Sequence, residues 1–201
     1  MRMIGRLNGR LNGIWLIAVA ALAAPLPATA AAIDPFLTPQ QPIAAPNGFV
    51  AMCSAQPDAC SDAGVSDAVA AANPKRLETL LRRVNRRVNR HVRQMSDEAR
   101  FGRHDLWRAS GMGRGAAGDC EDIAIEKRKL LVDAGVPAER LFLAVAYGRG
   151  GIGLHLVLIA RTDKGDVVLD SRSSSITPWS NAPYTWIAMQ SANRPDAWFS
   201  V

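Results

Sequence analysis

Residues 118–137 read GDCEDIAIEKRKLLVDAGVP, and this stretch decides how the rest of the chain is interpreted. Apolar residues recur in it at helical spacing over 120–134, and the Gly-Val-Pro at 135–137 is typical of a helix end. Cys120 would then lie in the first turn, where free backbone N–H groups and the helix dipole favour a thiolate. We therefore expect a helix that presents, at its N-terminus, a cysteine with a lowered pKa.

Three runs after this helix have the apolar, partly β-branched composition of strands, at 141–147, 155–161 and 167–170. In an antiparallel hairpin the start of one strand lies beside the end of the next, so we expect His155 and Asp170 to be neighbours at one sheet edge. A helix N-terminus packed against that edge would complete a triad of Cys120, His155 and Asp170. The alternative is that the cysteine and histidine are ordinary core residues.

Upstream, an amphipathic helix of about 20 residues is predicted from Leu77 to Met95, with arginines on its polar face. This face is either solvated or binds an anionic partner, and the scarcity of interleaved aromatics gives no support for nucleic-acid binding. The glycine-rich residues 101–118 read as an irregular loop. Helices followed by antiparallel strands predict the α+β class.

The N-terminus has the layout of a secretory signal peptide over residues 1–30. Arg2, Arg6 and Arg10 precede an apolar run at 14–24 and a small-residue site ending at Ala30. The 201 residues carry a formal charge of +6. Without these three arginines the chain has 21 basic and 18 acidic side chains, a net charge of +3. An uncleaved anchor is the alternative, although the apolar run is short for a membrane span. We expect a periplasmic protein with no stable membrane insertion after cleavage.

Residues 31–65 are predicted to be an extended lead-in to the domain at 66–201, and they contain two of the three cysteines. Cys53 and Cys60 are separated by a segment with a Pro-Asp turn signal, and disulfides persist in exported proteins. The predicted arrangement is a Cys53–Cys60 disulfide, with two free thiols or a metal site as alternatives. The pairing would leave Cys120 as the unpaired cysteine.

These blocks together resemble the bacterial transglutaminase-like cysteine peptidases. The resemblance rests on GDCED at 118–122, HLVL at 155–158, RTDKGD at 161–166, VLD at 168–170 and ITPW at 176–179. It implies a papain-related, transglutaminase-like fold. It also implies that Cys120 is the nucleophile, His155 the base and then the acid, and Asp170 the residue that orients His155. The backbone N–H of Cys120 is a candidate oxyanion donor, and Trp107 is a second candidate.

The resemblance further implies Ca²⁺ bound by Asp119 and Glu121, because carboxylate oxygens suit a hard cation. Asp122 or backbone carbonyls would have to complete the site, and the alternative is that these acids are ordinary first-turn charges. The implied substrate is a protein, a large surface adhesin whose cleavage releases cells from a biofilm. An inner-membrane cyclic-di-GMP receptor is the implied partner. A transglutaminase using the same thioester and a non-catalytic calcium-dependent binding module remain as alternatives.

Overall fold

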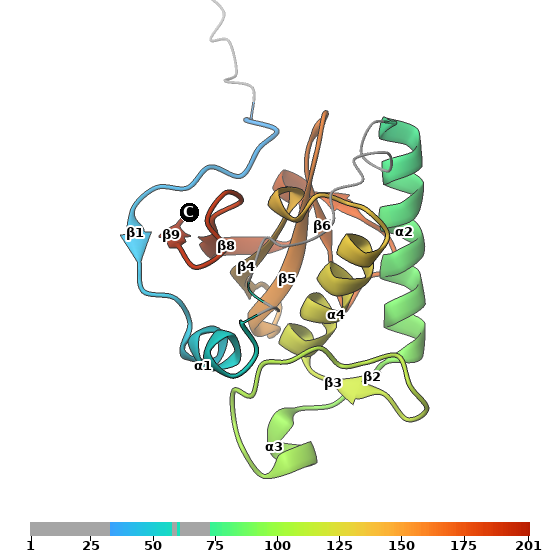
Figure 1. The fold of residues 1–201 in the computed structure, drawn as a ribbon. Coiled ribbons are helices and arrows are strands. Elements are labelled where there is room, and N and C mark those ends of the chain that lie inside the picture. Colours follow the sequence, from blue (N-terminus) through green and yellow to red (C-terminus); the bar gives the residue numbers. More distant parts are fainter. Residues whose placement is uncertain (1–32, 58–59, 61–72) are drawn as a thin grey trace, which may run out of the picture. The chain divides into compact units, whose positions relative to one another are not determined.

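The computed structural model describes residues 33–57, 60 and 73–201, which belong to one compact unit over Ile33–Val201 (Figure 1). The predicted signal peptide lies outside the described residues. Within the described part of the chain, no helix has the combined length and apolarity that crossing a membrane requires.

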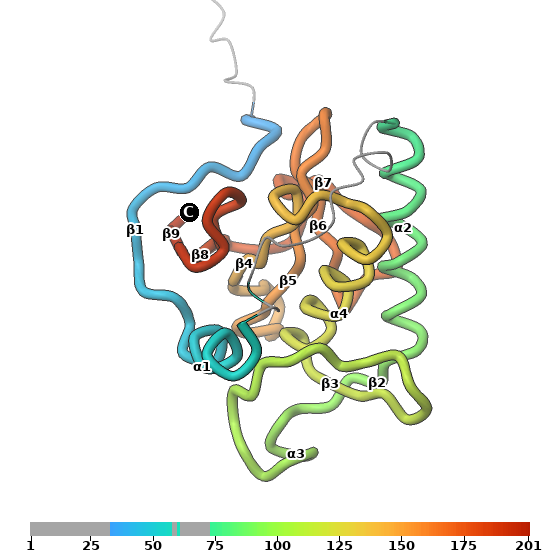
Figure 2. The backbone as a smooth tube through the Cα atoms, in the orientation of Figure 1, coloured from blue at the N-terminus to red at the C-terminus, as the bar shows by residue number. Residues whose placement is uncertain are grey.

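A seven-stranded antiparallel sheet forms the framework of this unit, with the strand order β1-β9-β8-β4-β5-β6-β7. The predicted strands correspond to the central β4, β5 and β6, whereas β8 and β9 come from the tryptophan-rich tail, where no strand was predicted. The tube trace shows β1 of the N-terminal segment beside the C-terminal β9 (Figure 2). The strands are β1 Pro42–Ile43, β4 Leu141–Gly148, β5 Gly153–Thr162, β6 Gly165–Leu169, β7 Thr177–Pro178, β8 Tyr184–Gln190 and β9 Trp198–Ser200.

Helices α2 and α4 pack together on one face of the sheet, so the predicted α+β class is confirmed. A second apolar cluster on the other face includes Phe142 and Ile159 and is covered by Leu37 of the N-terminal segment. A short parallel pair, β2 (Arg93–Gln94) with β3 (Ala117–Gly118), lies outside the large sheet. The helices are α1 Asn47–Ala55, α2 Pro74–His91, α3 Asp97–Phe101 and α4 Cys120–Asp133, with short 3₁₀ turns η2 Ala138–Arg140 and η3 Trp179–Asn181.

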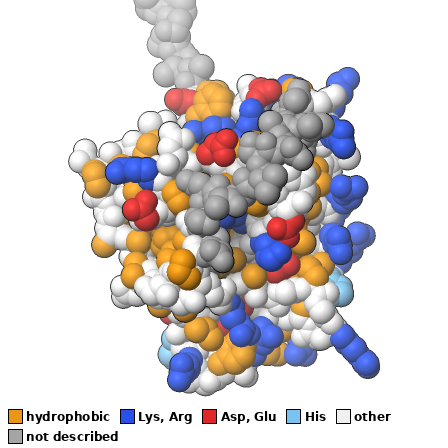
Figure 3. All heavy atoms as spheres, in the orientation of Figure 1, with side chains coloured by type: hydrophobic (Ala, Val, Ile, Leu, Met, Phe, Trp, Pro, Cys, Tyr) orange, Lys and Arg blue, Asp and Glu red, His pale blue; other side chains and the backbone are white. Residues whose placement is uncertain are grey.

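The two long helices follow from their sequences. In α2, Asn73 caps the first turn by accepting from the N–H groups of Lys75 and Arg76, and the apolar stripe is buried. The basic side chains of α2 gather along one edge of the molecule (Figure 3), so the predicted amphipathic pattern is confirmed, but the helix ends at His91, short of the predicted Met95, because the chain turns into β2. In α4, Asp119 is the N-cap, and Gly135 follows the helix with a φ of +84° that favours glycine.

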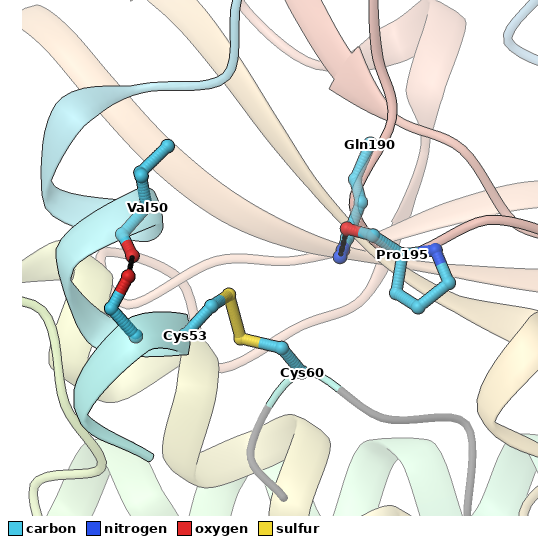
Figure 4. The surroundings of a disulfide bond; sticks show 6 residues. Val50, Cys53, Cys60, Gln190 and Pro195 are labelled. Atoms are coloured by element: carbon cyan, nitrogen blue, oxygen red, sulfur yellow. Dashed lines mark hydrogen bonds between the residues drawn. A yellow bond between two sulfur atoms is a disulfide. The ribbon is translucent and has the colours of Figure 1, made fainter. Parts of the chain in front are cut away.

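The lead-in predicted as extended contains a helix, α1, which packs Phe49 and Met52 into the core. The ring of Phe49 contacts Trp107 and Trp198 edge-on. This burial stabilises the helix although its sequence has only a weak helical pattern. The Cys53–Cys60 disulfide is present, with the Cα atoms 5.5 Å apart, and it ties the end of α1 to the following turn (Figure 4). The alternatives of free thiols and a metal site at this pair are therefore wrong.

Candidate active site

Cys120 is the first residue of α4, as predicted, and it is a free, partly buried cysteine. Its thiol donates to Oε2 of Glu121 at 2.8 Å and accepts a hydrogen bond from the backbone N–H of Leu156. This N–H is available because β6 ends at Leu169, which pairs with Leu158, so the first residues of β5 have no strand partner on that side among the described residues. The thiol therefore lies at the sheet edge next to His155.

The pKa of Cys120 differs from the expectation based on its position in the helix. Burial raises the pKa, and the charge and hydrogen-bonding of the neighbouring Glu121 raise it further. The N–H of Leu156 opposes this change without overcoming it. The prediction of a lowered pKa is wrong for this arrangement, because it considered the helix N-terminus and left out burial and the adjacent carboxylate.

His155 and Asp170 meet where the sequence predicts. Nε2 of His155 lies 2.8 Å from Oδ1 of Asp170, and both side chains are buried. The antiparallel register of β5 and β6 brings the start of one strand beside the residue that follows the other. Because Nε2 faces the carboxylate, Nδ1 is the ring nitrogen available to exchange a proton with a thiol.

Asp170 has two further hydrogen-bond donors. The hydroxyl of Tyr184 donates to Oδ2, and the backbone N–H of Arg172 donates to Oδ1 at 2.9 Å. Burial raises the pKa of Asp170, but the hydrogen bonds from His155, Tyr184 and Arg172 outweigh it, so the pKa lies below its usual range. Burial and the bond to Asp170 raise the pKa of Tyr184. The carboxylate is thus held ionised beside the imidazole, with the tyrosine as a neutral donor.

Three acidic residues converge beside the thiol. Asp97, Asp119 and Asp122 each offer a carboxylate oxygen, and these oxygens all lie within 4.8 Å of one another. Burial and then neighbouring carboxylates raise the pKa of Asp119 to about 6 and that of Asp122 to about 7, and burial raises the pKa of Asp97. Burial and mutual repulsion therefore disfavour the ionised forms of these carboxyl groups.

The chain shows clear likeness to known proteins. The family model of the bacterial transglutaminase-like cysteine proteinases matches residues 40–201. The chain belongs to this family. The calcium-bound LapG of Legionella pneumophila is 26% identical, with a TM-score of 0.52, and the match covers 61% of this chain and 68% of that one.

Two further Legionella pneumophila LapG structures, one of them EGTA-treated, are 28% and 27% identical, each with a TM-score of 0.49. These matches cover 58% and 56% of this chain and 64% and 62% of those chains. No curated protein matches the chain. The family and the calcium-bound structure confirm the predicted transglutaminase-like fold, and the proteinase is therefore a cysteine peptidase.

The acidic cluster of the proteinase differs in part from the predicted pair of metal ligands. Asp119 belongs to it, whereas Glu121 lies outside it, bonded to the thiol and to the carboxyl of Asp119. Asp97 was missed, because it is 22 residues before Asp119 and no spacing pattern links them. The parallel pairing of Gln94 with Gly118 brings the two segments together. A glycine is needed at 118, because a Cβ there would lie 2.5 Å from the side chain of Asp122.

Two oxygens of this cluster, Asp97 Oδ1 and Asp122 Oδ2, are buried without a hydrogen-bond partner in the described residues. The guanidinium of Arg108 approaches Asp122 Oδ2 only to 4.0 Å. Buried polar atoms are normally paired, so such oxygens are suited to a ligand that supplies positive charge. A hard divalent cation fits this donor set, and calcium chemistry is compatible with it.

Trp107 is not available as an oxyanion donor in the proteinase, contrary to the prediction. Its indole N–H donates to Oδ1 of Asp105 at 2.6 Å, and its ring is buried against Phe49 and Trp198. The side chain therefore belongs to the core. The other predicted donor, the backbone N–H of Cys120, remains a candidate.

A set of buried and half-buried polar side chains holds the segment that carries Asp170. Asn89 donates to the carbonyls of Asp170 and Ser173 at 2.8 Å, and Asn85 donates to the carbonyl of Ser173 at 2.9 Å. From α4, the amine of Lys127 reaches the carbonyl of Leu169 at 3.4 Å. Helices α2 and α4 therefore both fix the backbone at the end of β6, directly before Asp170.

Proposed function

We propose that the proteinase is an exported, calcium-dependent cysteine endopeptidase with Cys120 as nucleophile, His155 as base and acid, and Asp170 as the residue that orients His155. The observation that carries this proposal is the buried His155–Asp170 pair beside a thiol bonded to the N–H of Leu156, the next residue to His155. Acyl transfer requires a nucleophile next to a base, and the base in turn next to a carboxylate that orients it.

The proposed reaction begins when Nδ1 of His155 takes the thiol proton and Cys120 Sγ attacks a peptide carbonyl. Asp170 holds Nε2 and stabilises the imidazolium that forms. The backbone N–H of Cys120, at the start of α4, is the proposed donor to the oxyanion. His155 then gives its proton to the leaving amine, the thioester forms, and water activated by His155 releases the acid and restores the thiol.

Calcium is proposed to bind at Asp119 and Glu121, with Asp97 and Asp122 completing the oxygen donors. The unpaired, buried oxygens of Asp97 and Asp122 support this assignment, as does the calcium-bound state of the similar Legionella LapG. When bound, the ion would supply positive charge that balances the carboxylates beside the nucleophile.

The substrate is proposed to be a protein of the cell surface, a large adhesin whose cleavage releases cells from a biofilm. We also propose that the proteinase is periplasmic, through a signal peptide at residues 1–30, and that an inner-membrane cyclic-di-GMP receptor sequesters it. These proposals rest on the resemblance of the GDCED, HLVL and VLD blocks to the family and on the basic and apolar pattern of the N-terminus.

The decisive experiment measures peptide cleavage by mass spectrometry, with and without a primary amine, for wild type and Cys120→Ala. Wild type is expected to hydrolyse one peptide bond, and Cys120→Ala to lose that activity. Cleavage that survives in Cys120→Ala contradicts the assigned nucleophile. Amine incorporation without hydrolysis would identify a transglutaminase, and a thiol that alkylates no faster in wild type than in His155→Ala would identify a non-catalytic module.

Calcium dependence has its own test. Chelation with EGTA is expected to reduce activity, and added Ca²⁺ to restore it, whereas Mg²⁺ is not, because it prefers fewer ligands in a stricter octahedron. Activity and melting temperature that do not change on chelation would leave the acidic residues as ordinary first-turn charges.

A further inference from the structure

Lys127 is a charged residue on the buried face of α4. Its side chain is fully buried, with 0% exposed, and it shares this face with Ile123, Ala124 and Leu131 of the core. An ammonium has three N–H donors, and among the described residues this one has a single acceptor, the carbonyl of Leu169 at 3.4 Å. Burying a charge that is so weakly bonded is unfavourable, and a methionine of similar length would avoid that cost. Core packing therefore gives no reason for a lysine at this position.

The charge of Lys127 acts on Asp170. The carbonyl that the amine contacts belongs to Leu169, the residue directly before Asp170. Burial lowers the pKa of Lys127 to about 7, and Asp170 is the charged group that opposes this change. The amine is therefore mostly protonated below pH 7. In that range it provides a buried positive charge beside the carboxylate that orients His155.

The other groups around Lys127 in the described part of the chain direct no charge toward it. From α2, the amides of Asn85 and Asn89 bond carbonyls of the segment after β6, and both amides are neutral. The charged neighbours of Lys127 on α4 are engaged elsewhere, because Glu126 accepts from a backbone N–H of the glycine-rich loop and Arg128 donates to a carbonyl of β4. The field of Lys127 is therefore felt mainly by the carboxylate at the end of β6.

The titratable groups around His155 leave Lys127 as the buried cation of the site. Tyr184 is a neutral donor to Asp170, and Glu121 is bonded to the thiol. Arg172 is an exposed residue, so water and salt screen its guanidinium. The charge of a buried ammonium is screened much less, because the interior has a lower dielectric constant than water.

This charge affects the two proton transfers of the proposed reaction. When Nδ1 of His155 takes the thiol proton, the imidazolium depends on Asp170 as its counterion. A protonated Lys127 already shares that carboxylate, so a second positive charge beside it is less favourable. The neutral imidazole then persists to lower pH, and the imidazolium, once formed, gives its proton more readily to the leaving amine.

We propose that Lys127 is a positioning residue for proton transfer, whose buried ammonium acts through Asp170 to keep His155 neutral and able to accept the thiol proton at mildly acidic pH. This inference rests on the proposed function. Lys127 acts through the carboxylate and contacts neither the thiol nor a peptide bound to it. A merely structural lysine would affect stability and leave the pH profile of the reaction in place.

The first test measures kcat/KM from pH 4 to 9 on a peptide that wild type cuts, with calcium present. The acid limb reports the base of the free enzyme, and it is expected to move to higher pH by at least about 0.5 unit in Lys127→Met and Lys127→Gln. Glutamine keeps a donor for the carbonyl of Leu169 and removes only the charge. The matched control is Lys129→Met, which removes the same charge from an exposed pair with Asp133 on α4 and should leave the limb unchanged.

The second test needs no turnover. The imidazole titration of His155 is followed by NMR in calcium-loaded Cys120→Ala, with and without Lys127→Gln, and the signal is assigned by its loss in His155→Ala. The midpoint is expected to rise by at least about 0.5 pH unit when the lysine charge is removed. Circular dichroism establishes that each variant is folded, and if Lys127→Gln does not fold, Lys127→Met takes its place in the NMR comparison.

The outcomes separate this inference from the proposed function. If wild type cuts no peptide, or Cys120→Ala still cuts, the proposed function fails and Lys127 has no such reaction to tune. If cleavage depends on Cys120 but the acid limb or the NMR midpoint stays in place in Lys127→Gln, or either moves to lower pH, only the role of Lys127 is wrong. A limb that moves in Lys127→Met but not in Lys127→Gln assigns the effect to the hydrogen bond and also overturns the role of the charge.

Discussion

Replacing Tyr184 by phenylalanine tests whether Asp170 must be held ionised for His155 to act. The tyrosine hydroxyl is the donor that the structure gives to Oδ2 of Asp170, while His155 and the N–H of Arg172 both bond Oδ1. Tyr184→Phe keeps the ring, which packs against His155 at a centroid distance of 5.6 Å, and removes only the hydroxyl. The substitution therefore leaves a buried carboxylate oxygen without its donor.

The expected cost follows from the charge of the acceptor. A hydrogen bond to a charged group contributes about 1.5–3 kcal/mol, so removing the donor to this buried carboxylate is expected to cost an amount within that range. If this free energy is lost from the transition state, because His155 is less well oriented there, kcat/KM falls about 10- to 100-fold. The free energy of unfolding is expected to fall by a similar amount, about 2 kcal/mol.

The pH dependence gives a second readout. Because the pKa of Asp170 is lowered in the folded state, its stabilisation is complete above the unfolded value of about 3.9 and is lost as the pH falls through the folded value. Without the Tyr184 hydroxyl the folded pKa rises, so the acid limbs of both stability and activity should move to higher pH.

The assay compares urea unfolding and kcat/KM from pH 3 to 8 for wild type, Tyr184→Phe and Thr162→Val. Thr162 loses a hydroxyl bonded to the neutral carbonyl of Gly165 in the β5–β6 turn, so its variant should lose stability with no shift of either limb. An unchanged acid limb in Tyr184→Phe, or an equal shift in the threonine control, would refute the role assigned to the tyrosine.

Three other changes test different parts of the molecule. Removing the disulfide with Cys53→Ala and Cys60→Ala, in a Cys120→Ala background, should cost about 2–2.5 kcal/mol for a loop with a separation of seven residues, and calorimetry should find a Tm lower by about 5–10 °C; a change under about 2 °C contradicts the estimate. Asp97→Asn should weaken calcium binding in titration calorimetry at least tenfold, while the exposed Asp133→Asn should not, and equal affinities would remove Asp97 from the site. Burial lowers the pKa of Lys127 to about 7, so the free energy of unfolding of wild type should rise with pH between about 7 and 10.4, by at most about 1.4 kcal/mol per pH unit. Urea titrations of Lys127→Met should show a flatter rise. A rise that persists in this variant would assign the pH dependence to another group.

The sequence was sufficient to predict the parts that depend on local pattern. Helix α4 with Cys120 at its start, the hairpin that joins His155 to Asp170, and the disulfide all follow from spacing within short segments. Helix α1 and strands β8 and β9 were missed because their residues are placed by long-range burial. Phe49 and Trp198, from opposite ends of the chain, contact each other at a centroid distance of 5.3 Å, and no local periodicity reports such a pairing.

The same distinction explains the candidate site. Asp119 and Glu121 were predicted as metal ligands from the family resemblance of the GDCED block, and sequence neighbours of this block could not point to Asp97. In the structure Glu121 bonds both the thiol and the carboxyl of Asp119, while Asp119 also clusters with Asp97 and Asp122. The pairing of β2 with β3 determines this set, and two-residue strands leave almost no signal in the sequence.

The positions of the buried polar groups link the two halves of the site. Asp170 is reached from the sheet by His155 and Tyr184, and its backbone carbonyl is held from α2 by Asn89. Because α4 carries Cys120 at one end and contacts the Leu169 carbonyl through Lys127, a shift of that helix would move the nucleophile and the backbone beside the orienting carboxylate together. Buried hydrogen bonds of this kind are costly to break singly, so they restrict both helices to one arrangement against the sheet. The geometry of thiol, imidazole and carboxylate is therefore set by core packing as much as by the three residues themselves.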